Sequence, residues 1–399
     1  MKIGILRETK NPPDRRVPLT PKQCRMLQER FDGMKIVVQP SDYRCFTDAE
    51  YEQEGVALQE DVRECDLLLG VKEVDIPTLI PGKSYLFFSH TAKEQPHNRK
   101  LLQAVIGHNI TLLDYEYLTR KDKSRVVAFG RWAGIVGTYN GLRAYGLRNG
   151  KFELQPAWKL SGLEEMKSSV ADLAMGNVRV VLTGGGRVAG GAVEILEAAG
   201  FNEIVPESFM NVEGVGKIFT RLDPWHYAKH RQGKPFNFKH FVEYPGEYEN
   251  AFVPYASVSD MFIACHFWDP FSPEMLTRED LKSVPLKIIA DISCDIDGPI
   301  ASTIRPSTIA EPLYGYDPAT GTEAENPFSE KVITVMAVDN LPGELPRDAS
   351  TDFGNALIEN VFPALLEGDT DGIIQRATIA KDGKLTELFS YLEDYVNGN

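Results

Sequence analysis

Four ionisable residues in the first third of the chain stand where side chains could carry out proton transfer. Arg16, Lys72, His90 and Glu116 each fall at the end of an expected β-strand or in the turn after one. In an open parallel sheet, ligands bind beyond the carboxyl ends of the strands. A desolvated lysine can act as a base, a histidine carries protons near neutral pH, and an arginine can hold a carboxylate. These residue types favour an acid–base site, although each one alone also fits a surface or capping role.

A glycine-rich turn in the middle of the chain predicts a dinucleotide site. Gly184, Gly186 and Ala189 match the pattern G-x-G-x-x-[GA], after an apolar strand at 178–183 and at the start of an amphipathic helix. Glycines let the backbone turn tightly beside a pyrophosphate, and the N–H groups at the helix start bind its charge. A plain glycine-rich turn is the alternative, but strand, turn and helix together favour nucleotide binding.

An acidic residue after this turn bears on the choice of cofactor. Glu207 follows the expected strand at 203–205, which is the next one along the chain. An acid about 20 residues past the glycines hydrogen-bonds the ribose hydroxyls and repels a 2′-phosphate. Glu207 therefore favours NAD and leaves NADP open, with a solvated loop acid as the alternative.

Apolar runs alternate with stretches of helical spacing in two series. The expected strands lie at 2–6, 35–38, 66–71, 84–89, 111–115, 178–183, 203–205, 259–265, 286–291 and 331–338. A long helix at 131–148 separates the series and carries small residues, Gly134 and Gly137 among them, where a neighbour can pack closely. This alternation is typical of α/β proteins with parallel sheets. We expect two Rossmann-like, doubly wound domains with a cleft between them; a single large sheet is the alternative.

Three further segments have clear expectations. A helix is expected at 20–30, with Thr20 as its cap and Pro21 in its first turn. The Pro- and Gly-rich segment 311–328 is expected to be a loop, and 351–366 a helix. The segment 221–241 is locally basic and aromatic, so it is either a solvated loop or a rim that attracts an anionic substrate.

The composition excludes several classes of protein. The 399 residues are 43% hydrophobic and 25% charged, as in globular proteins, and the net charge of −14 argues against a nucleic-acid partner. The five cysteines form no CxxC pair, so neither a disulfide framework nor a metal site is expected. The start lacks the apolar stretch of a signal peptide, and no apolar run is long enough to span a membrane, so we expect a cytoplasmic protein.

Several stretches together resemble one enzyme family. They are RVPLTP at 16–21, GVKE at 70–73, FSHT at 88–91, FGRWAG at 129–134, LTGGG at 182–186, DIS at 291–293, VDNLP at 338–342 and LPRDAS at 345–350. Over nearly its whole length the chain resembles the lysine-forming saccharopine dehydrogenases, and above all the lysine–ketoglutarate reductase half of the animal bifunctional enzyme. The arginine, lysine and histidine positions are shared with alanine dehydrogenases and transhydrogenases, so they mark this superfamily rather than a substrate.

The resemblance implies a division of the chain and a set of roles. Residues 1–135 and 325–399 would form a discontinuous substrate domain, and 136–324 an inserted dinucleotide-binding domain. Lys72 and His90 would be the acid–base pair, tuned by Glu73 and Glu116, with Arg16 and Arg131 binding substrate. Together with Glu207 and the glycine turn predicted above from spacing, the cofactor would be bound by Gly184, Gly186, Arg187, Val188, Ala189, Arg125, Asp291, Ile292, Asp339, Asn340 and Leu341.

The activity implied is the reversible cleavage of saccharopine to lysine and 2-oxoglutarate, with these small molecules as partners. The animal reductase prefers NADP and has no acid at the position of Glu207, so its cofactor preference is not carried over. Because the chain ends at Asn399 without a second dehydrogenase domain, a monofunctional protein is expected. An alanine or opine-type dehydrogenase and a non-catalytic NAD-binding sensor remain as alternatives. The oligomeric state stays open, a homo-oligomer included.

Overall fold

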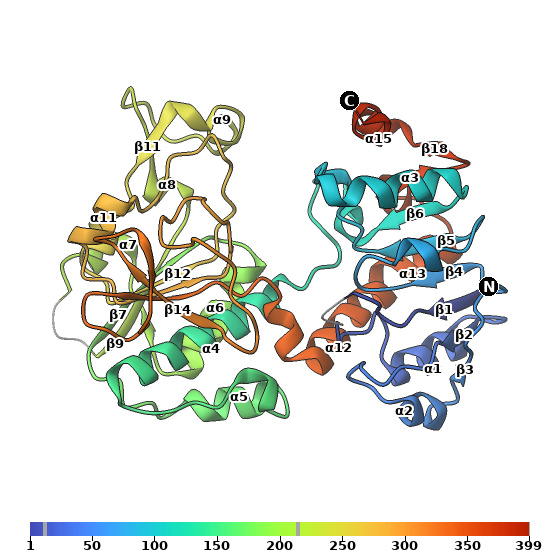
Figure 1. The fold of residues 1–399 in the computed structure, drawn as a ribbon, viewed down its shortest axis with the longest axis horizontal. Coiled ribbons are helices and arrows are strands. Elements are labelled where there is room, and N and C mark those ends of the chain that lie inside the picture. The colour runs from blue at the N-terminus through green and yellow to red at the C-terminus, as the bar shows by residue number, and fades with distance from the viewer. Residues whose placement is uncertain (11–13, 213–215, 399) are drawn as a thin grey trace. The chain divides into compact units, whose positions relative to one another are not determined.

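The computed structural model describes residues 1–10, 14–212 and 216–398 and divides the chain into two α/β units (Figure 1). Unit 1 is formed by residues 1–129 and 346–399, and unit 2 by residues 130–345. The predicted discontinuity of the first domain is therefore confirmed. The predicted boundaries after 135 and 324 differ from these bounds, because the long helix begins at Gly130 and the strand Ile333–Met336 belongs to the second sheet.

Unit 1 contains an eight-stranded sheet that the C-terminal segment completes. Its strand order is β18-β17-β6-β5-β4-β1-β2-β3, and the pairs from β6 to β3 are parallel. The strands are β1 (Lys2–Ile5), β2 (Lys35–Val38), β3 (Ala57–Leu58), β4 (Leu67–Leu69), β5 (Ser84–Phe87), β6 (Thr111–Asp114), β17 (Thr378–Lys381) and β18 (Lys384–Leu385). β17 pairs antiparallel with β6, which joins residues near the C-terminus to the N-terminal sheet.

The helices of unit 1 begin and end for local reasons. The helices are α1 (Pro21–Arg30), α2 (Asp48–Gln53), α3 (Arg99–Gly107), α12 (Pro346–Ala356), α13 (Phe362–Leu366), α14 (Ile373–Ala377) and α15 (Glu393–Asn397). As predicted, Thr20 caps α1 through a capping box with Gln23, and Pro21 stands in the first turn. The predicted helix at 351–366 is interrupted by a π-helical segment, Leu357–Val361. Pro363 explains the wider turn, because its ring lacks an N–H and would clash with the carbonyl four residues earlier.

Unit 2 contains a second mixed, mainly parallel eight-stranded sheet, with the order β15-β14-β16-β13-β12-β7-β9-β8. The strands are β7 (Val178–Thr183), β8 (Asn202–Glu203), β9 (Lys217–Leu222), β12 (Met261–Ala264), β13 (Ile288–Asp291), β14 (Leu313–Asp317), β15 (Thr322–Ala324) and β16 (Ile333–Met336). The expected loop at 311–328 was wrong, because it contains the antiparallel hairpin β14–β15. The buried side chains of Tyr314 and Tyr316 hold this hairpin in the sheet. The prediction of a loop relied on the Pro and Gly content of the segment and did not consider these two tyrosines.

Two helices of unit 2 pack with their backbones in contact. Figure 1 shows α4 (Gly130–Asn149) beside α6 (Arg187–Ala198). A Cβ at Gly134 would collide with the backbone carbonyl of Val188, and a Cβ at Gly191 with that of Arg131. The predicted close packing along the long helix is thus confirmed. No helix among the described residues is long and apolar enough to cross a membrane.

The chain between β9 and β12 forms a small lobe, which we call the hairpin lobe (Pro224–Asn250). It consists of α8 (Pro224–Tyr227), α9 (Phe238–Glu243) and the antiparallel pair β10 (Ala228–His230) and β11 (Tyr248–Asn250). The sequence analysis interpreted 221–241 as either a solvated loop or a rim that attracts an anionic substrate, and it predicted none of these elements. The four remaining α-helices among the described residues of unit 2 are α5 (Leu163–Val170), α7 (Pro206–Phe209), α10 (Val253–Ala256) and α11 (Arg278–Ser283).

Candidate active site

The predicted acid–base residues of unit 1 gather where the order of the first sheet reverses. From β1 the chain continues to β2 and β3 on one side, and it then returns to β4 on the other side. The carboxyl ends of β1 and β4 therefore lie next to each other, which is the usual place for a ligand in such a sheet. Lys72 and Glu73 follow β4, and Glu8 follows β1. His90 and Glu116 follow β5 and β6, the next two strands.

Glu8 fixes the backbone that carries Lys72. Its carboxylate accepts hydrogen bonds from the N–H groups of Val71 at 2.6 Å and of Lys72 at 2.9 Å. Burial raises the pKa of Glu8 to about 7, and these two bonds oppose the rise. The sequence analysis did not single out Glu8, although it follows a strand end just as the other candidates do.

Lys72 has the surroundings of a lysine that can act as a base. Burial lowers the pKa of its ammonium group, and the positive charges of Arg16 and Lys10 lower it further. The carboxylates of Asp14 and Glu73 act in the opposite direction. The net direction is downward, which brings the neutral amine closer to physiological pH.

Glu73 and His90 form a tight pair beside Lys72. Glu73 Oε1 lies 2.6 Å from His90 Nδ1, and Glu73 Oε2 lies 3.0 Å from the ammonium group of Lys10. Burial would raise the pKa of Glu73, but the bond and charge of His90 and the bond from Lys10 bring it down to about 2. A carboxylate at Nδ1 fixes the proton there and leaves Nε2 for proton exchange. His90 also has a left-handed backbone, with φ of 52°, which is uncommon outside glycine and often found at functional sites.

Glu116 lies at the other side of this cluster. It forms ion pairs with Arg125 at 2.5 Å and with Lys93 at 3.3 Å. Burial acts to raise the pKa of Glu116, and the charges of Arg125, Lys93 and His90 lower it overall. Asp114 supports the same turn by accepting hydrogen bonds from the backbone and the hydroxyl of Ser89, which precedes His90.

Arg16 is held by an acid that the sequence analysis missed. Its guanidinium donates to both carboxylate oxygens of Asp14, at 3.0 and 2.6 Å, and it lies over the ring of Phe129 at 4.2 Å. Arg16 is 4% exposed, so this pair is buried. The charge and hydrogen bonds of Arg16 lower the pKa of Asp14 despite its burial. Arg16 would therefore have to bind a substrate carboxylate while it is paired with Asp14. This role of Arg16 stays a prediction.

The glycine turn of unit 2 has the geometry that a pyrophosphate requires. Gly184 has φ of 105°, and a Cβ on it would lie 2.6 Å from the carbonyl oxygen of Cys265. The order of the second sheet reverses here, because β9 and β8 lie on one side of β7 and β12 lies on the other. Gly186 caps α6, and nothing lies within 4 Å of where its Cβ would be. The space over Gly186, at the start of this 12-residue helix, is therefore open for a phosphate.

The strand next to the glycine turn is β9, which the sequence analysis missed. Glu207 follows β8, the edge strand, and β9 separates β8 from β7. The residue that follows β9 is Asp223, and its Oδ1 lies 2.6 Å from the position of a Cβ on Gly185. Glu207 is 77% exposed and lies 3.9 Å from His226. Asp223 thus faces the turn from the position where an acid meets a ribose in this kind of fold.

The other predicted residues of unit 2 have structural partners. Arg131, on α4, donates to both carboxylate oxygens of Glu194 on α6, at 3.0 and 2.9 Å. Asp291, at the end of β13, is fully buried and accepts hydrogen bonds from Thr303 and Ser293.

Ile292 and Leu341 pack against Gly137 of α4. Arg187 and Val188 open α6, Ala189 is buried in it, and Asp339 and Asn340 precede the 3-10 turn Leu341–Glu344.

One histidine beside the glycine turn was not predicted. His266 follows β12, and its Nδ1 lies 2.7 Å from the hydroxyl of Thr183, the last residue of β7. Burial lowers the pKa of His266 to about 4. The imidazole is therefore neutral at physiological pH and serves as a hydrogen-bonding group rather than a charge.

Comparisons with known proteins agree with this geometry. Residues 4–136 match the family described as alanine dehydrogenase/PNT, N-terminal domain. The solved structure of an L-alanine dehydrogenase superposes with a TM-score of 0.68 at 16% identity, covering 100% of this chain and 99% of that one. A transhydrogenase from Sinorhizobium meliloti superposes with a TM-score of 0.62 at 14% identity, covering 97% of this chain and all of that one. These two likenesses show the fold.

Two kinds of relative align over almost the whole chain. The α-aminoadipic semialdehyde synthase of Arabidopsis thaliana is 31% identical, and the mitochondrial one of Mus musculus is 30% identical, each over 98% of this chain. The chain spans only 41% and 47% of the length of these two relatives. A saccharopine dehydrogenase [NAD(+), L-lysine-forming] of Emericella nidulans is 28% identical, over 92% of each chain.

The fold and site define a class, the alanine dehydrogenase-like oxidoreductases, whose members are NAD(P)-dependent dehydrogenases acting on CH–NH donors. Within this class the chain is similar over most of its length to the lysine-forming saccharopine dehydrogenases and to the α-aminoadipic semialdehyde synthases. The resemblance predicted from the sequence is thereby confirmed.

Proposed function

We propose that the protein is an NAD-dependent saccharopine dehydrogenase that interconverts saccharopine with lysine and 2-oxoglutarate. The observation that carries this proposal is the pair Glu73–His90, joined at 2.6 Å beside Lys72 at the reversal of the first sheet. The similarity supplies the substrate class, because a relative named for this reaction aligns over 92% of the chain. The charges around the cluster agree with a substrate that has several carboxylates, since Arg16, Lys10 and Lys93 are all placed there.

The residues of unit 2 fit a bound dinucleotide. The open space over Gly186 and the tight turn at Gly184 leave room for a pyrophosphate at the start of α6. Asp223 would hydrogen-bond the ribose hydroxyls and repel the 2′-phosphate of NADP, which favours NAD. Glu207, the acid predicted from the sequence, is less well placed to bind the ribose because it follows the edge strand.

The proton transfers follow from the geometry of the cluster. A dinucleotide held by Gly184, Gly186 and the start of α6 would supply the hydride acceptor, and oxidation of the substrate carbon would leave an imine to the lysine side-chain nitrogen. Lys72 first takes the proton of the secondary ammonium group, so that the nitrogen lone pair can assist hydride departure. His90 Nε2 takes a proton from the water that adds to the imine and returns it to the nitrogen. His90 Nε2 then takes the proton of the hydroxyl group that the added water has formed, as the C–N bond breaks. Lys72 finally protonates the released amine, and His90 releases one proton to solvent.

One assay separates this proposal from its competitors. The oxidation of NADH is followed with lysine plus 2-oxoglutarate, with pyruvate plus ammonia, and with no substrate. The proposal expects turnover in the first mixture alone. Turnover with pyruvate and ammonia would instead show an alanine dehydrogenase. NADH binding without turnover in any mixture would show a non-catalytic sensor.

A further inference from the structure

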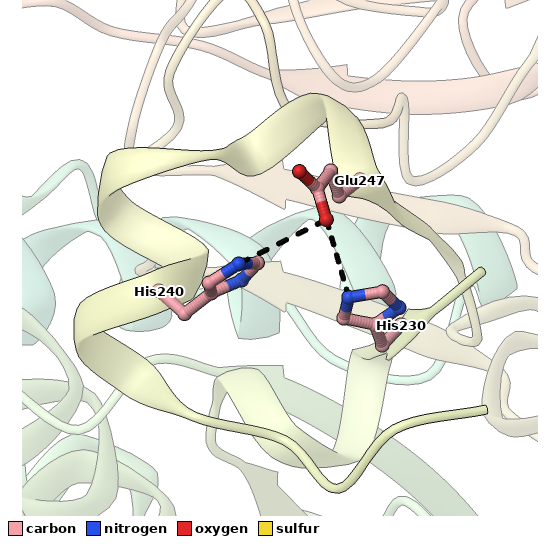
Figure 2. A group of neighbouring side chains, drawn as sticks. All are labelled: His230, His240 and Glu247. Atoms are coloured by element: carbon pink, nitrogen blue, oxygen red, sulfur yellow. Dashed lines mark ion pairs between the residues drawn. The ribbon is translucent and has the colours of Figure 1, made fainter. Parts of the chain in front are cut away.

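Three side chains with metal-binding atoms converge in the hairpin lobe (Figure 2). His230 ends β10, His240 lies in α9, and Glu247 ends the short turn before β11. Glu247 Oε2 lies 3.3 Å from His230 Nε2 and 3.8 Å from His240 Nε2. One potential ligand atom from each residue lies within 4.8 Å of the other two. Among the described residues this is the one such group of three.

The buried histidine of this group makes no hydrogen bond through the nitrogen that faces the group. The side chain of His230 is 2% exposed, and its Nε2 is buried without a hydrogen-bond partner. Glu247 Oε2 is near enough for a hydrogen bond, but its direction from the ring does not allow one. Buried polar atoms are almost always satisfied, so an unsatisfied one calls for a missing partner. With the ring proton on Nδ1, a cation between Nε2 and the carboxylate would satisfy both groups.

The spacing matches that of ligands around a small transition-metal ion. Zinc lies about 2.0–2.2 Å from nitrogen and oxygen ligands, and in a tetrahedral site such ligand atoms are about 3.3 Å apart. The two distances to Glu247, 3.3 and 3.8 Å, are close to this value. Two imidazoles and one carboxylate suit zinc and its neighbours, whereas magnesium and calcium prefer oxygen ligands alone.

His240 has the tautomer that ligation needs. Its Nδ1 lies 3.2 Å from the hydroxyl of Tyr248, and this hydroxyl donates in turn to the carbonyl of Asn237 at 3.3 Å. The hydroxyl proton is therefore engaged, so Nδ1 of His240 is the donor and its Nε2 keeps a free lone pair. An outer partner of this kind is typical of histidines that bind metals.

His230 must change its protonation to bind an ion. Its Nδ1 accepts a hydrogen bond from the N–H of Gln232 at 3.1 Å, so in the neutral ring the proton sits on Nε2. Ligation through Nε2 requires that this proton move to Nδ1, so that the ring stays neutral. A proton on Nδ1 would break the bond from Gln232. The turn at Gly233 therefore has to adjust when an ion binds.

We propose that His230, His240 and Glu247 bind one divalent transition-metal ion of the zinc type, which fastens α9 to the β10–β11 pair. Three protein ligands leave one coordination position for water, on the side of an open groove lined by Lys234, Asn237 and Lys239. The sequence analysis predicted no metal site, because the three residues are separated along the chain and only the fold of the lobe brings them together.

Zinc titration of the metal-free protein tests the proposal. After treatment with a chelator and its removal, Zn²⁺ is titrated by calorimetry, and we expect one ion per chain with a dissociation constant in the micromolar range or below. His240→Ala and Glu247→Gln should each weaken binding at least about tenfold. The control His97→Ala removes an exposed histidine of unit 1 and should leave binding unchanged. Absence of stoichiometric binding, or equal binding by the wild type and His240→Ala, would overturn the proposal.

Two spectroscopic readings check the geometry. Co²⁺ in place of zinc should give the visible absorption of a tetrahedral nitrogen–oxygen site in the wild type and lose it in Glu247→Gln. The amide resonance of Gln232 should shift on zinc addition, because its acceptor is displaced. Circular dichroism of the variants ensures that lost binding does not reflect lost folding. None of the three ligands belongs to the proposed catalytic cluster, so ion binding and NADH oxidation are measured as separate outcomes.

Discussion

The carboxylate of Asp223 occupies the space that a side chain on Gly185 would need, with its Oδ1 2.6 Å from the position of the missing Cβ. Position 185 thus has to be a glycine because the acid at the end of the neighbouring strand fills the space beside it. Asp223 also donates its backbone N–H to His226 at 3.0 Å, which fixes the start of α8. This relationship makes Asp223 the first residue to test for cofactor choice.

Asp223→Ser should reduce the preference for NAD over NADP by about tenfold or more. The carboxylate that repels a 2′-phosphate is lost, and one hydroxyl-binding group with it. The measurement is kcat/KM for each cofactor. The matched control is Glu207→Ser, which removes an exposed acid after the edge strand and should change the preference little. A narrowed preference in Glu207→Ser alone would return the role to the acid predicted from sequence.

His90→Gln and Lys72→Met should each lower kcat by about 10²–10⁴-fold, because each removes a group that moves protons in the proposed reaction. Neither residue belongs to the glycine turn, so the dissociation constant of NADH should change little. Steady-state kinetics and fluorescence titration with NADH separate the two effects. Near wild-type turnover in either variant would remove that residue from the mechanism.

Glu73→Gln should lower stability by about 1–3 kcal/mol near neutral pH, because it removes a charged partner from His90 and Lys10. Glu73 has its pKa lowered from 4.5 to about 2 in the fold. A lowered pKa contributes stability above about pH 4.5, and this contribution is lost as the pH falls toward 2. The difference between wild type and Glu73→Gln in urea unfolding should therefore shrink in that window. A difference that stays constant would contradict the assignment, and the exposed Glu52→Gln serves as the control.

Local signals singled out most of the side chains that the structure brings together in unit 1. Lys72, His90 and Glu116 were found because each follows an apolar run, and the carboxyl ends of parallel strands meet at one edge. The capped start of α1 and the glycine turn also carry their signals in a few adjacent residues. The pairing of Asp14 with Arg16 was missed because spacing does not reveal whether two nearby charges are buried together.

The order of strands in the second sheet could not be predicted from the chain. The strand β9, with the sequence KIFTRL, contains polar residues and was not among the predicted strands. The chain reaches the edge strand β8 before it returns to β9 beside β7, so the next strand in sequence is not the next in space. The choice of Glu207 rested on that assumption. The hairpin β14–β15 was missed for a related reason, since its pairing partner β16 comes later in the chain.

Alanine substitutions at two adjacent glycines of α6 should change the stability of the protein in opposite directions. A Cβ at Gly191 would meet the backbone carbonyl of Arg131 on α4, which cannot move without separating the helices. Gly191→Ala should therefore lower stability by at least about 1–3 kcal/mol. Nothing lies within 4 Å of a Cβ at Gly190, so Gly190→Ala should raise stability by about 0.5–1 kcal/mol through its better helix propensity. Urea midpoints of the two variants and the wild type measure both effects, and a loss of stability of similar size in both would show that the helix contact does not distinguish them.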